Sequence, residues 1–67
     1  MANLISAIQE ECNRLRDHVL PEYDKIPHGE LAATLMRQSI KVAEAAIAGG
    51  DVVLCVKCLK DLQSYTL

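Results

Sequence analysis

The side chains best suited to chemistry in this sequence are three cysteines, two of which form a Cys-x-x-Cys motif at Cys55 and Cys58. Such a pair can supply two ligands to a zinc ion or act as a redox dithiol. Zinc needs four ligands, and the other candidates are Cys12, His18 and His28; on one helix, Cys12 and His18 would point about 120° apart. Redox motifs usually follow a β-strand, and none is apparent. We therefore favour core or interface packing of these thiols, with metal binding and redox chemistry as open alternatives.

The two histidines do not suggest an active site. His28 could form an acid–base pair with Asp24, but no nucleophile in a recognisable setting accompanies them. Glycine-rich phosphate loops and paired-carboxylate motifs are also missing from the sequence. We therefore expect no enzymatic activity, no cofactor and no bound metal.

Proline and glycine divide the chain into three stretches with helical periodicity, at residues 3–20, 29–48 and 52–65. Pro21 is expected to end the first helix, and Gly49-Gly50 the second, because glycine readily adopts the left-handed conformation at a helix end. Asp51 is the predicted N-cap of the third helix. Only two residues separate the second and third helices, which predicts an antiparallel hairpin.

These elements predict an all-α fold, in which the hairpin of the second and third helices packs on the first helix. Residues 1–67 form a single domain of this kind. Its 51% apolar residues include no Trp or Phe and only two Tyr, so the core must be built from aliphatic side chains. A domain this small is marginally stable alone, and a homodimer is the simplest way to enlarge its core.

The charge balance argues against several classes of partner. Seven Lys and Arg stand against nine Asp and Glu, without a basic stripe, so direct nucleic-acid binding is not expected. The third helix begins Asp-Val-Val-Leu-Cys-Val, which does not suit a recognition helix. No apolar run approaches the roughly 20 residues that cross a bilayer, and the N-terminal residues do not resemble a signal peptide. We expect no membrane partner and a cytoplasmic location.

The second helix carries two adjacent apolar stripes, which together cover nearly half of its surface. The first comprises Leu31, Leu35, Val42 and Ala46, and the second Met36, Ile40, Ala43 and Ile47. On the third helix we expect Val52, Cys55, Val56, Leu59 and Leu62 to face inward. This apolar surface exceeds what two neighbouring helices easily cover, which indicates a protein interface. The predicted interface residues are Met36, Ile40, Ile47, Val53, Leu54, Cys58 and Tyr65, with Tyr23 as an anchor.

Polar side chains on the outer faces are expected to give such an interface its specificity. Glu10 and Arg14 are spaced to pair at i, i+4 on the first helix. Asp17, Arg37, Lys41 and Glu44 are the other charged candidates.

Two segments, Leu20–Pro27 (LPEYDKIP) and Ala43–Val53 (AEAAIAGGDVV), resemble short helical proteins encoded by phages and prophages. Together they cover under a third of the chain. That group includes anti-CRISPR proteins and other inhibitors of bacterial defence, which typically cover a surface of a host complex without catalysis, often as dimers. The resemblance implies a non-enzymatic phage-type inhibitor that binds a host protein complex in the host cytoplasm. The alternatives are a small metal-stabilised or DNA-associated regulator and a structural subunit of a larger assembly.

Overall fold

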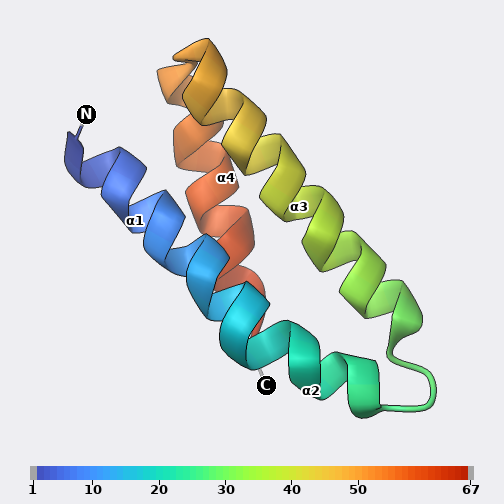
Figure 1. Cartoon of the computed structure of the whole chain (residues 1–67). Helices are drawn as coiled ribbons and strands as arrows, with labels where there is room; N and C mark the ends of the chain where they lie inside the picture. The colour runs from blue at the N-terminus through green and yellow to red at the C-terminus, as the bar shows by residue number, and fades with distance from the viewer. Residues whose placement is uncertain (1, 67) are drawn as a thin grey trace.

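The computed structural model describes residues 2–66, and every regular element in that range is helical. α1 (Ala2–Arg14) continues through one π-helical stretch, η1 (Leu15–Val19), into α2 (Leu20–Lys25). α3 (Glu30–Gly49) and α4 (Val52–Ser64) follow. In Figure 1, α1 and α3 lie on either side of the view, with α4 between and behind them. The predicted all-helical fold with three helices packed together is confirmed.

The first helical segment is longer than predicted because Pro21 does not end it. Proline has no backbone N–H, so Pro21 cannot donate the usual helical hydrogen bond to the carbonyl of Asp17, four residues back. The chain widens just before this point, and the Leu20 N–H bonds to Leu15 O, five residues back. Pro21 then occupies the first turn of α2, where a missing N–H is tolerated.

The helix ends instead at Ile26, immediately before Pro27. Ile26 has φ −83° and ψ 129°, the extended conformation that a following proline favours. The loop then turns back tightly onto α2. Gly29 is buried in this turn, and a Cβ on it would collide with the backbone carbonyl of Tyr23. A residue without a side chain is therefore required at the start of α3.

The turn from α3 to α4 follows the predicted chemistry. Gly50 is in the left-handed conformation, with φ 68°, and its N–H bonds back to the last turn of α3. Asp51 N–H bonds to Ala46 O at 3.2 Å, and the Asp51 carboxylate accepts from Leu54 N–H at 3.1 Å. Asp51 is thus the N-cap of α4, as predicted.

One apolar core joins the helices. α4 packs against both α1 and α3, whereas α1 and α3 touch each other only slightly. No polar or charged residue is buried among residues 3–66. The core consists of Ile8, Cys12, Leu15, Val19, Leu20, Ala33, Met36, Ile40, Ala43, Ala46, Cys55, Cys58 and Leu62.

The inner face of α4 differs from the predicted one. Val52 and Val56 are 46% and 41% exposed, and Cys58 takes their place in the core. The buried positions Cys55, Cys58 and Leu62 are spaced by three and four residues, as one helical face requires. The inner face is therefore rotated away from the two valines, which lie on the surface.

Candidate functional site

The three cysteines lie in the apolar core, as the favoured prediction requires. Cys12, Cys55 and Cys58 are free thiols with exposed fractions of 3%, 1% and 6%. Burial raises the pKa of the Cys12 thiol, and the neighbouring Arg16 opposes that rise only in part. Burial also raises the pKa of Cys58. A thiol with a raised pKa is a poor nucleophile, so Cys12 and Cys58 are not set up for thiolate chemistry. All three cysteines pack in the core as small apolar side chains.

The other chemistry-bearing residues are dispersed over the surface. His18 is exposed in η1 and His28 in the loop before α3. The Asp24 carboxylate, considered above as a partner of His28, accepts bonds from Arg37 at 3.0 and 3.2 Å. Within residues 2–66, no three His, Cys, Asp or Glu side chains gather in a way that could hold a metal ion.

A groove runs between α1 and α3, where these helices are only loosely in contact. An ion pair between Arg16 and Glu44, 2.9 Å long, bridges it and borders two hollows of about 480 and 300 Å³. The hydrogen bond to Glu44 raises the pKa of Arg16. Cys12 also lines the larger hollow and Lys41 the smaller one. The residues that line the two hollows are mostly polar or charged, and the one thiol among them, Cys12, is buried.

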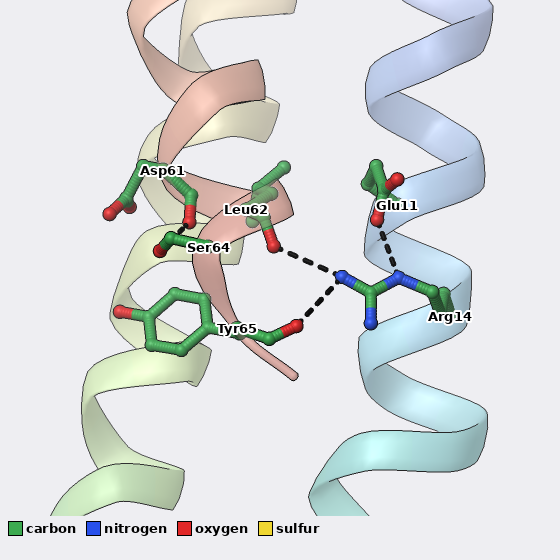
Figure 2. A network of polar contacts seen from close by, with 6 residues as sticks. All are labelled: Glu11, Arg14, Asp61, Leu62, Ser64 and Tyr65. Carbon is green, nitrogen blue, oxygen red and sulfur yellow. Dashed lines mark hydrogen bonds and ion pairs between the residues drawn. The ribbon is translucent and has the colours of Figure 1, made fainter. Parts of the chain in front are cut away.

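A second arginine holds the end of α4 against α1 (Figure 2). Arg14 Nη2 donates to the carbonyl oxygens of Leu62 and Tyr65, at 3.2 and 2.9 Å. Its Nε donates to the Glu11 carboxylate at 2.6 Å, so the partner is Glu11 and not Glu10 as predicted. The last carbonyls of a helix lack partners within the helix, and a cation is favoured there by the helix dipole. Arg14 is therefore a structural clamp, and it is less available to a partner protein than its charge suggests.

Two groups of exposed apolar side chains remain, and they form the candidate binding surfaces. The first is the α3 apolar face, made of Leu31, Leu35 and Val42, which are 73%, 52% and 39% exposed. The second, the α4 valine patch, is made of neighbouring side chains at the start of that helix: Val52, Val53 and Val56. Soluble monomers rarely expose large apolar side chains in contiguous groups, so such groups often mark contact surfaces.

The structure distributes the predicted interface residues between the core and the surface. Met36, Ile40 and Cys58 are 1%, 3% and 6% exposed, because the chain's own helices cover them. They are core residues of this fold and not surface residues. Val53 is the most exposed of the predicted set, at 67%. The remaining members, Tyr23, Ile47, Leu54 and Tyr65, are partly buried against the core.

Both tyrosines help to fix the C-terminal segment. The Tyr65 hydroxyl lies 2.9 Å from the Ser39 hydroxyl on α3, and the Tyr23 hydroxyl donates to Thr66 O at 3.1 Å. These bonds occupy the polar ends of both side chains. The role of Tyr23 as an anchor for a partner stays a prediction.

The sequence predicts that the second stripe of α3 is the spare one. In the structure it is instead Leu31, Leu35 and Val42 of the first stripe that are exposed, whereas the fourth member of that stripe, Ala46, is buried. Both stripes have helical spacing and similar composition, so periodicity alone could not choose between them. One signal was present: the second stripe and its flanks contain Ala33 and Ala43, which allow the close approach of a neighbouring helix.

No helix within residues 2–66 is long and apolar enough to cross a membrane. Comparison of the chain with protein-family models, curated proteins and solved structures finds no match.

Proposed function

We propose that this chain is a non-enzymatic protein-binding module, and specifically a phage-type inhibitor of a bacterial defence complex that acts by steric occlusion. In this proposal the α3–α4 hairpin packs on α1, and the domain works as a homodimer in the host cytoplasm. The observation that carries the proposal is the exposure of six large aliphatic side chains in two groups, the α3 apolar face and the α4 valine patch. The phage and inhibitor parts rest on the sequence resemblance of Leu20–Pro27 and Ala43–Val53.

The exposed valines are the part of this surface best suited to a target. Val53 is 67% exposed, and Val52 and Val56 adjoin it on the same helix. Asp51 and Lys57, both exposed, lie beside the patch and give it a charged rim. An apolar centre with a polar rim is the usual arrangement of a protein-binding surface.

Binding by steric occlusion requires a rigid surface and not a reactive one. The start of α4 is held by the Asp51 N-cap and its end by the Arg14 clamp. The valine patch therefore sits on a helix that is fixed at both ends. A preformed surface loses less conformational entropy on binding, which favours affinity.

The test is a phage-plating assay in bacterial strains that each carry one active CRISPR-type defence system. The wild-type chain should raise the plating efficiency of a targeted phage at least about a hundredfold in at least one strain. Val53→Asp and Val56→Asp should abolish that gain, since a buried unpaired carboxylate costs several kcal/mol at an interface. Gln63→Asp makes the same helix more acidic outside the patch and should retain it.

Circular dichroism of each variant establishes that it is folded before the plating result is used. If the wild-type chain protects phage in none of the strains, the inhibitor assignment is wrong. If Val53→Asp protects phage as well as the wild type, the target does not bind the valine patch.

A further inference from the structure

The smaller of the two hollows beside the Arg16–Glu44 ion pair, with a volume of about 300 Å³, collects positive charge. Its charged lining residues are Arg16, Arg37, Lys41 and Glu44. Three positive charges therefore border it against one negative charge, although the whole chain has a net charge of −2. We call this feature the cationic hollow.

The fold assembles the cationic hollow from separate parts of the chain. Arg37 and Lys41 are four residues apart and lie on one face of α3, whereas Arg16 comes from η1. η1 is π-helical, and such turns are rare and occur frequently at functional sites. The charge is thus brought together by packing and does not appear in the sequence as a basic run.

Many of the N–H donors around the cationic hollow are not engaged within the described residues. A guanidinium has five N–H donors. Arg37 contacts the Asp24 carboxylate through Nη2, and Arg16 contacts Glu44 through Nη2, which leaves Nε and Nη1 of both side chains for a ligand. Lys41 forms no ion pair with another described residue.

The two carboxylates that compete for these arginines are held weakly. The Glu44 and Asp24 side chains are 54% and 51% exposed. Ion pairs as exposed as these contribute little free energy, because water screens them. A ligand with more negative charge and more acceptor oxygens can therefore replace either carboxylate at small cost.

We propose that the cationic hollow is a binding site for a small phosphate monoester, whose phosphate is bound by Arg16, Arg37 and Lys41. A phosphate monoester carries close to two negative charges and three strong acceptor oxygens at neutral pH, which suits three cations better than a carboxylate does. Arginine binds phosphate through two parallel hydrogen bonds, and lysine binds it as a point charge.

The organic group of the ligand has an apolar surface to contact. Leu20 and Ile40, which are 6% and 3% exposed, line the same hollow. A volume of about 300 Å³ lies at the lower end of the range for small-molecule pockets, about 300–1,000 Å³. The ligand is therefore a small monoester with a compact apolar group.

This site is separate from the surface assigned to the proposed function. Of the described residues, those that line the cationic hollow belong to η1, α2 and α3, whereas the valine patch lies on α4. A ligand bound there joins the first helical segment to α3 and stabilises the folded chain by mass action.

The first experiment is an NMR titration of the ¹⁵N-labelled full chain with phenyl phosphate, at constant ionic strength. The pH is kept above 7, because the second pKa of a phosphate monoester is about 6. We expect saturable shifts of amides in η1 and in the middle of α3, with a dissociation constant on the order of 1 mM. The absence of saturable shifts at roughly ten times that concentration would overturn the site.

Two further ligands test the chemistry of the site. Inorganic phosphate should bind several-fold more weakly than phenyl phosphate because it has no apolar group, and acetate should bind more weakly still. If acetate binds as tightly as phenyl phosphate, the assignment to phosphate is wrong. If inorganic phosphate binds as tightly as phenyl phosphate, Leu20 and Ile40 do not contact the ligand.

Lys41→Gln should weaken binding of phenyl phosphate at least about fivefold, because it removes one charge-assisted contact. The fold should be unaffected, since Lys41 forms no ion pair with a described residue, and circular dichroism checks this. Lys57→Gln is the matched control: it makes the same charge change at an exposed position of α4 and should leave binding unchanged. Equal weakening by both variants would mean a response to net charge and would overturn the site.

Glu44→Gln should have the opposite effect, because it removes the carboxylate that competes for Arg16. Phenyl phosphate should bind more tightly to this variant, whereas Asp61→Asn, the same charge change on α4, should not alter binding. Unchanged or weaker binding by Glu44→Gln would overturn the role of Arg16. Val53→Asp should bind phenyl phosphate like the wild type, so failure of the phage-plating test and failure of this site are distinguishable.

Discussion

Replacing Arg14 with alanine is expected to destabilise the fold more than the loss of any other ion-pairing side chain in this structure. Arg14 Nη2 donates to Leu62 O and Tyr65 O, two carbonyls at the end of α4, and Nε donates to Glu11. No other charged side chain of the described residues bonds to the backbone of a distant helix. The clamp therefore joins α1 to residues at the end of α4 that are 48 and 51 positions further along the sequence.

The magnitude follows from the number and exposure of these bonds. A hydrogen bond with a charged partner contributes about 1.5–3 kcal/mol when it is well shielded. The Arg14 side chain is 34% exposed, so water replaces part of each bond, and we reduce the sum of the two backbone bonds to about 2 kcal/mol. For a domain of this size, that loss lowers the melting temperature by roughly 8–16 °C.

The assay is urea unfolding followed by circular dichroism, at one protein concentration because the proposed self-association would contribute to apparent stability. Arg37→Ala is the matched control: it breaks the ion pair with Asp24, in which both side chains are about half exposed, and should cost under about 1 kcal/mol. Arg14→Lys should fall between the two, because lysine keeps the charge but loses the planar fork of donors. If Arg14→Ala costs no more than Arg37→Ala, the clamp does not stabilise this fold.

Three further changes probe the turns and the core. Gly29→Ala should cost about 1–3 kcal/mol in the same unfolding assay, because the added Cβ meets the backbone of Tyr23. Gly49→Ala has open space around it and should be neutral or stabilising by up to about 1 kcal/mol. Equal effects of the two substitutions would contradict this account. Asp51→Ala removes the N-cap of α4 and should cost about 1 kcal/mol, whereas an unchanged midpoint would mean that the cap is dispensable. Burial raises the pKa of the Cys12 and Cys58 thiols above 9.0, the value for a thiol in the unfolded chain. The stability that these two thiols contribute is therefore fully present below that pH and is lost as the pH rises through their higher pKa values in the folded chain. Above pH 9.0, the melting temperature should fall less steeply with pH in a chain with both thiols replaced by alanine than in the wild type. Parallel curves of melting temperature against pH for the two chains would refute the argument.

Local chemistry made several elements predictable from the sequence. The α3–α4 turn needed a residue that tolerates positive φ and an acceptor for the first free N–H groups of α4, and Gly50 and Asp51 supply them. The inner face of the first helical segment, formed by α1 and η1, was predictable because Ile8, Leu15 and Val19 are its regularly spaced large apolar residues beyond the first turn. In both cases one choice of residues satisfied the local requirement.

Pro21 shows where local rules were insufficient. A proline ends a helix when its missing N–H and its ring cannot be accommodated. Here a π-helical turn shifts the hydrogen bonds ahead of it, and the packing of Val19 and Leu20 in the core compensates for the disturbance. Whether such compensation exists depends on contacts with other helices, which the sequence around Pro21 does not contain.

Periodicity and turn chemistry were enough to predict that the chain is helical, where α3 ends and α4 begins, and that the fold has more apolar surface than it easily buries. They did not predict which apolar stripe of α3 faces the core, because that depends on the neighbouring helices. Met36 and Ile40 face the core and Leu31 and Leu35 face outward, although both pairs have helical spacing. The physical reason is that periodicity specifies which residues share a face, whereas burial depends on where α1 and α4 lie around that helix, and this is set by the packing of all the helices together.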